Sequence, residues 1–113
     1  MGAWGTGIYE NDLACDVRDW YEDSMKSGTD HAETVEEIVR RFFIWEDDAH
    51  EAAGWYAVAD CVLSHGIADE TLNRKVLRLI ADDPESMTWI NQTLRDERKK
   101  VLERLRKRIM KGV

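Results

Sequence analysis

The sequence has few of the residues that would place it outside the ordinary globular proteins. Only two cysteines and one proline occur in 113 residues, which excludes a disulfide framework and a proline-rich linker. The apolar runs are short, and this excludes a membrane-spanning helix. No basic segment followed by an apolar stretch opens the chain, so we expect no signal peptide. We therefore expect a cytoplasmic globular protein with no membrane contact.

Sustained alternation of apolar and polar residues is also missing, so β-strands have little support. Apolar residues recur instead at intervals of three and four, which is typical of amphipathic helices. Helices are predicted over residues 12–26, 31–43, 48–64, 69–80 and 84–110. The expected fold class is all-α. We predict a single domain over residues 1–113, a compact bundle of four to five helices with a glycine-rich N-terminal arm and a long basic C-terminal helix.

Capping residues support these helix boundaries. Asn11 or Asp12 is expected to cap the first helix and Asp30 the second, because a short polar side chain accepts a hydrogen bond from a free backbone N–H. Gly28 suits the left-handed conformation that often ends a helix. Asp83 followed by Pro84 resembles a cap and a first helical position, so the last helix is expected to begin there.

The charge is unevenly placed along the chain. Residues 1–70 hold 17 acidic and 4 basic residues, whereas residues 71–113 hold 6 acidic and 12 basic residues. The two parts therefore carry balances of −13 and +6, within a net charge of −7. The simpler interpretation is that acidic helices fold against the basic last helix and partly neutralise it. The alternative is that the carboxylates remain outward as a charged docking face.

The opening segment MGAWGTGIYEND is the most unusual part of the sequence. It lacks the GK[ST] tail and the preceding strand of a phosphate-binding loop, so nucleotide binding is not favoured. We expect a structural role instead. Gly5 and Gly7 permit tight turns or positive φ angles, and Trp4 and Ile8 are expected to plug one end of the bundle.

The first 16 residues, MGAWGTGIYENDLACD, resemble the start of a bacterial family catalogued as domain of unknown function 4259. Its members typically open with MGAWGxG, followed by an aromatic residue, Asn-Asp, Ala and Asp. The corresponding positions here are Met1–Gly7, Tyr9, Asn11, Asp12, Ala14 and Asp16. Members often carry a Leu-Trp near the end, where this chain has the basic run Arg95–Lys111. The resemblance implies a small, mainly helical protein, and it brings no catalytic residues.

Acidic residues suggest a metal site only weakly. Four aspartates share one face of the first predicted helix, and Asp47 with His50 forms a single carboxylate-x-x-His unit. A helical di-metal site repeats that unit on two helices, so we expect a solvated acidic stripe, no metal and no cofactor. A metal-dependent hydrolase that uses these acids remains the alternative.

Two further features are weighed in the same way. Cys15 and Cys61 lie in predicted helices with no histidine nearby in sequence, so both are interpreted as small apolar fillers rather than nucleophiles. The basic run near the C-terminus suggests nucleic-acid binding, but three acids interrupt it and the whole chain is acidic. Nucleic-acid binding is therefore disfavoured, and an adaptor that uses this helix is a second alternative.

The function expected from these patterns is non-enzymatic protein binding. Its most specific form is an immunity protein or antitoxin that neutralises a basic toxin, because carboxylates can block a cationic active site. Trp55 falls off the inward face of the third predicted helix, and tryptophan is frequent in binding hot spots. Self-association stays open. The candidate protein-binding residues are Asp12, Asp19, Asp23, Asp47, Asp48 and Trp55.

Overall fold

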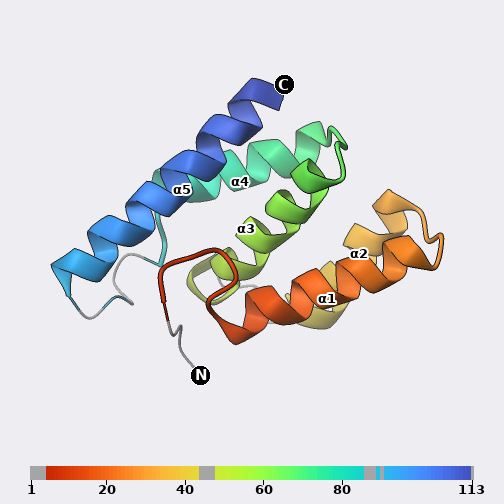
Figure 1. Ribbon diagram of the computed structural model, residues 1–113, viewed down its shortest axis with the longest axis horizontal. Helices are drawn as coiled ribbons and strands as arrows, with labels where there is room; N and C mark the ends of the chain where they lie inside the picture. The colour runs from red at the N-terminus through yellow and green to blue at the C-terminus, as the bar shows by residue number, and fades with distance from the viewer. Residues whose placement is uncertain (1–4, 44–47, 86–88, 90, 113) are drawn as a thin grey trace.

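Five α-helices follow one another along the chain in the computed structural model (Figure 1). They are α1 (Asp12–Lys26), α2 (His31–Phe42), α3 (Asp48–Ser64), α4 (Glu70–Asp82) and α5 (Gln92–Gly112). The structure describes residues 5–43, 48–85, 89 and 91–112, without the side chains of residues 48–50. No strand occurs in these residues, so the all-α prediction of a five-helix fold is confirmed.

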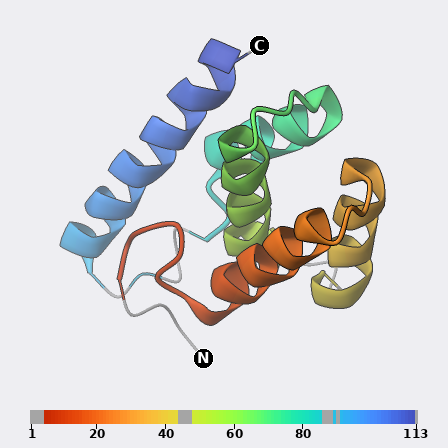
Figure 2. The same cartoon turned by 45° about the vertical axis from the view of Figure 1, so that its right-hand side comes forward.

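The third helix is the centre of the fold. α1 packs on one side of α3 and carries α2 with it, whereas α4 and α5 pack on the other side (Figures 1 and 2). Small side chains allow this, because they let neighbouring backbones approach closely. Residues that are at most 2% exposed follow one another along α3: Ala52, Tyr56, Ala57, Val58, Ala59, Cys61 and Val62.

Glycine has a specific packing role in α3. A Cβ atom on Gly54 would lie 2.3 Å from Cε1 of Phe43, so only glycine lets this ring rest on the helix. The ring of Phe43 is in turn 4.6 Å from that of Trp55, centroid to centroid.

No helix in the described part of the chain combines the length and the apolar character that a membrane crossing requires.

The structure selects Asn11 over Asp12 as the cap of α1 and confirms Asp30 as the cap of α2. The side chain of Asn11 accepts a hydrogen bond from the Ala14 N–H at 2.8 Å, and Asp30 caps α2 in the same manner. Gly28 has a φ of 85° just beyond the end of α1, which is the left-handed conformation that glycine adopts without strain. The caps and Gly28 act on residues that are close in sequence, and this is why the sequence alone could predict them.

The predicted start of the last helix was wrong. Asp83 ends α4, where it adopts a left-handed conformation with φ 47° and ψ 58°. The chain turns at Pro84, and α5 begins only at Gln92, with the Asn91 side chain accepting a hydrogen bond from the Leu94 N–H. Proline is frequent both at the first position of a helix and directly after a helix end. Because Asp83 ends α4 in a left-handed conformation, Pro84 here follows a helix end and does not begin a helix.

Candidate protein-binding face and the clusters that position it

The four aspartates of α1 lie on one solvent-exposed face. They are Asp12, Asp16, Asp19 and Asp23, all of them exposed, and their spacing of 4, 3 and 4 residues places them along one side of a helix. Asp19 pairs with its neighbour Arg18 at 3.4 Å. Within the described part of the chain, no three His, Cys, Asp or Glu side chains converge as metal ligands would. The stripe has the geometry of a solvated face.

The other candidate residues do not join this face. The side chains of Asp47, Asp48 and His50 lie outside the described residues, so the candidate Asp47–His50 unit is not placed. Trp55 is half-buried. Its ring packs on Phe43 and lies 5.5 Å from the ammonium group of Lys75 in α4. The described contacts of Trp55 therefore place it between α3 and α4 and not beside the aspartates of α1.

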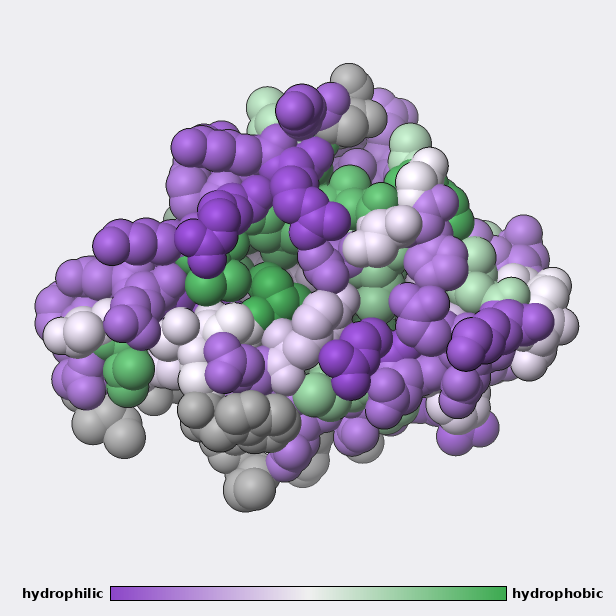
Figure 3. Space-filling model, in the orientation of Figure 1, coloured by the Kyte–Doolittle hydropathy of each residue, from purple (hydrophilic) through white to green (hydrophobic). Residues whose placement is uncertain are grey.

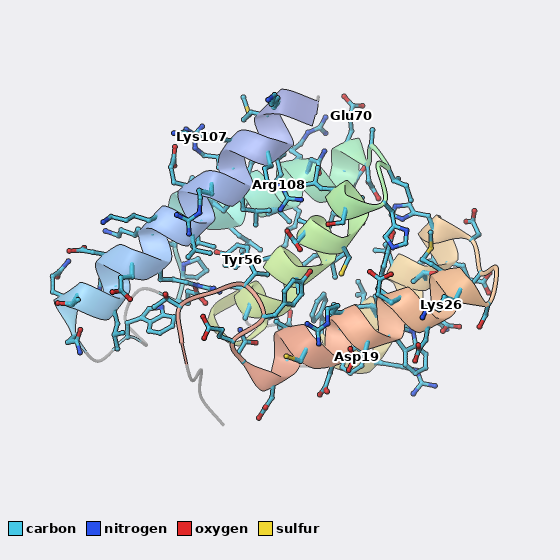
Figure 4. The ribbon with its side chains drawn as sticks, viewed as in Figure 1. Asp19, Lys26, Tyr56, Glu70, Lys107 and Arg108 are labelled. Atoms are coloured by element: carbon cyan, nitrogen blue, oxygen red, sulfur yellow. The ribbon has the colours of Figure 1, made fainter. Side chains whose placement is uncertain are left out.

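The acidic and basic helices lie on opposite sides of the molecule. In Figure 4, Asp19 on α1 and Lys107 on α5 are separated by α3, and Arg108 reaches from α5 toward that helix. Its guanidinium pairs with Asp60 of α3. In the space-filling view, hydrophilic residues cover α1 and α5, and hydrophobic residues show between them (Figure 3). The expectation that the acidic helices neutralise the last helix is therefore wrong for α1, because α3 separates the two.

The N-terminal loop wraps around one carboxylate. The backbone N–H of Gly7 donates to Oε1 of Glu10 at 3.0 Å, and a Cβ atom on Gly5 would lie 2.1 Å from Oε2 of Glu10. Neither glycine has a positive φ; of the two expected roles, the tight turn is the one observed, closed by the hydrogen bond from the Glu10 N–H to the Gly7 carbonyl oxygen. The glycines also allow the close approach of Glu10. Ile8 packs against the core as predicted, and Trp4 lies outside the described residues.

A first cluster, around the buried Arg98, attaches this loop to α5. Arg98 is 3% exposed; its Nε donates to Glu85 at 2.7 Å, and its Nη1 donates to the carbonyl oxygens of Thr6 and Gly7, each at 3.1 Å. A buried charge needs such partners, since burial removes its hydration. The sequence analysis considered the basic run as a whole and did not single out Arg98. Its position four residues before the buried Leu102 was the available signal.

A second cluster ties the loop to α3. The Tyr9 hydroxyl donates to Oδ2 of Asp60 at 2.6 Å and lies 3.3 Å from Sγ of Cys61. Burial, together with the hydrogen bond to Asp60, raises the pKa of Tyr9 far above its usual range. Burial also raises the pKa of the Cys61 thiol to about 11. Both groups are therefore protonated at neutral pH, and neither is a nucleophile, because the thiolate and not the thiol is the reactive form of cysteine.

A third cluster, around His31, joins α1, the start of α2 and the start of α4, and the sequence analysis missed it. His31, the first residue of α2, lies 3.2 Å from the Tyr21 hydroxyl and 2.9 Å from the Asp69 carboxylate. This hydroxyl–imidazole–carboxylate order is that of a catalytic triad, but Tyr21 is fully buried, so a substrate cannot reach its hydroxyl. Burial also raises the pKa of Tyr21 to about 12. The cluster holds helices together.

Asp69 serves two elements at once within this cluster. It is the N-cap of α4, since its Oδ1 accepts from the Leu72 N–H at 3.0 Å, and it also binds His31 of α2. Partial burial alone would raise the pKa of Asp69. The hydrogen bonds from Leu72 and His31 outweigh this effect and hold the pKa below its usual value. A parallel contact, His65 to Glu22 at 2.8 Å, ties the end of α3 to α1.

Comparison with known proteins adds one relationship. No curated protein matches the chain significantly, and no solved structure does so either. A family model described as "Domain of unknown function (DUF4259)" matches residues 2–113. That span includes the N-terminal loop, the three clusters and all five helices. Because the match covers nearly the whole chain, this protein belongs to the DUF4259 family.

Proposed function

We propose that this protein binds a basic protein partner through the acidic face of α1 and that it does so without catalysis. The observation that carries the proposal is the exposure of all four aspartates on one side of α1, with α3 between them and the basic helix. An exposed stripe of this kind, in which only Asp19 has an ion-pair partner, attracts cationic surfaces and accelerates encounter. In its most specific form, the partner is a toxin whose cationic site the aspartates cover, as in an immunity protein or antitoxin.

Two features argue against the alternatives. The best nucleophile candidates, Cys61 and Tyr9, are protonated at neutral pH, and Cys61 is 2% exposed. A metal-dependent hydrolase would require convergent ligands, whereas the aspartates of α1 lie in a row along a single helix. A row of carboxylates suits an extended cationic surface better than a single ion.

The association rate constant tests the proposal. The partner is captured from the source organism on the immobilised protein, purified, and its binding kinetics are followed between about 20 and 300 mM NaCl. We expect the association rate constant to fall on the order of tenfold over this range, because salt screens exposed charges. The variant D12N/D16N/D19N/D23N is expected to associate slowly already at low salt, with little change in its dissociation rate.

A matched variant separates the location of the charge from its amount. E33Q/E36Q/E70Q/D82N also removes four exposed carboxylates, but from α2 and α4. Both variants have a net charge of −3 instead of −7. The proposal requires fast association for the matched variant and slow association for the α1 variant. Equal slowing in both variants, or a partner that docks on α5, contradicts it.

A further inference from the structure

The two outermost helices carry charge stripes of the same spacing and opposite sign. On α1 the exposed aspartates are separated by 4, 3 and 4 residues. On α5 four exposed cations follow the identical spacing: Lys100, Arg104, Lys107 and Lys111. In each stripe the first and last charges are 11 positions apart, which corresponds to about 16 Å along a helix. A straight helix bearing one stripe therefore matches the other charge for charge.

Within the described part of the molecule the two stripes are largely uncompensated, and on α1 only Asp19 has an ion-pair partner, its neighbour Arg18. Among the described residues, none of the four α5 cations takes part in a hydrogen bond or ion pair with another side chain. α5 packs on α4 and α3, and α1 packs on α3 and α2, so α3 lies between the two helices that carry the stripes. Met110, the one large apolar side chain that is strongly exposed in the described part, lies beside Lys107 and Lys111 at 55% exposure.

We infer that the occupant of the α5 stripe is the α1 stripe of a second copy of this chain. The contact joins two different surfaces, so each molecule in a pair still offers one unused stripe, and association continues as an open series. This inference goes beyond the proposed function but uses the same acidic face. Self-association and the basic partner therefore compete for α1, and the partner releases the copies from one another.

The strength of the contact follows from its exposure. Exposed ion pairs are individually weak and are screened by salt, and the net charge of −7 repels two copies from each other. A dissociation constant on the order of 0.1–1 mM is expected at low ionic strength. At about 300 mM NaCl the Debye length falls well below 10 Å, so the contact disappears.

Sedimentation equilibrium of the full chain, at up to about 1 mM protein, tests the inference. The wild-type average mass should rise with concentration at about 10 mM NaCl and should equal the monomer mass at about 300 mM. The variants D16K/D19K and R104E/K107E should each remain monomeric at both salt concentrations. The combined four-site variant restores opposite stripes and the original net charge, so its mass should again rise with concentration.

A control excludes a simple effect of net charge. E33K/E36K on α2 changes the net charge by the same amount as D16K/D19K, and this control should still associate. Circular dichroism first verifies that every variant is folded. A wild-type protein that stays monomeric at 1 mM and low salt overturns the inference, as does association that persists in both single-stripe variants.

The outcome is independent of the basic partner. Loss of self-association with retained partner binding refutes only this inference. Self-association without any basic partner refutes only the proposed function.

Discussion

At the scale of single residues, Arg98 is the buried charge that connects three separate parts of the chain. It binds Glu85, two loop carbonyl groups and the face of the Trp89 ring, whose centroid is 5.9 Å away. One guanidinium thereby connects α5, the segment after α4 and the N-terminal loop. The family motif at the N-terminus is held in place by a residue more than 90 positions away.

Replacement of Arg98 by methionine should destabilise the protein by about 3 to 5 kcal/mol, because it removes one side of the buried ion pair with Glu85 and the hydrogen bonds to Thr6 and Gly7. Urea unfolding followed by circular dichroism measures this free energy. R104M, an exposed site on the same helix, should change it by less than about 0.5 kcal/mol. R98M/E85Q should recover part of the loss, since the carboxylate charge of Glu85 is then removed as well. A loss below about 1 kcal/mol in R98M would contradict the assigned role.

The structural role of a residue was predictable from the sequence where its hydrogen-bond partner lies nearby in the sequence. Asn11 and Asp30 were recognised as caps because each satisfies a backbone N–H two or three residues further along. Arg98 and His31 were not, because their partners lie far away in sequence or on another helix. A lone arginine in a basic run has the same sequence pattern whether it is solvated or buried. Its environment depends on which helices meet, and this is a property of the tertiary fold.

At the scale of helices, the boundary between α4 and α5 shows where local signals become ambiguous. Asp83–Pro84 is compatible with the start of one helix or with the end of another. The alanine-rich composition of α3 was less ambiguous, since small residues favour close packing on several sides. Its central position was therefore predictable, whereas the eight-residue shift in the start of α5 was not.

The contact between α2 and the start of α4 gives a pH-dependent prediction. The pKa of Asp69 is lowered in the folded protein, so the unfolded chain binds more protons at this site near its unperturbed pKa of about 3.9. Its contribution to stability is therefore fully present above that pH and is lost as the pH falls through the folded-state pKa. Asp69→Asn keeps the capping oxygen but removes the titrating group.

Urea unfolding of the wild type and of D69N from pH 7 to pH 3 measures this contribution. The difference in unfolding free energy between the two proteins should be constant above about pH 5 and should shrink as the pH falls below 4. D82N, at an exposed site in the last turn of α4, serves as the control for the removal of a surface carboxylate from the same helix. A D69N difference that is independent of pH would contradict the assigned coupling between Asp69 and His31.

At the scale of the whole molecule, the fold keeps the acidic face of α1 apart from the basic helix, while Asp60 of α3 pairs with Arg108 of α5. The acids of α1 lie on one side of α3 and the cations of α5 on the other. The sequence showed the charge imbalance between the two parts of the chain but not how it is placed in space. The packing of α5 against α4 and α3 decides this, because α1 packs on α3 and α2 and not on the basic helix.

The separation predicts how salt changes stability. Like charges at intervals of three and four residues repel one another by about 0.2 to 0.5 kcal/mol per pair, and each stripe contains three such intervals. Salt screens this repulsion, so the melting temperature should rise between about 10 and 200 mM NaCl, by about 4 °C for a gain near 1 kcal/mol. D12N/D16N/D19N/D23N should melt higher than the wild type at 10 mM and respond less to salt. Thermal unfolding followed by circular dichroism, in dilute protein so that association is absent, measures both effects. If the aspartates instead neutralised α5 within the fold, salt would weaken attractive pairs, and the wild-type melting temperature would fall.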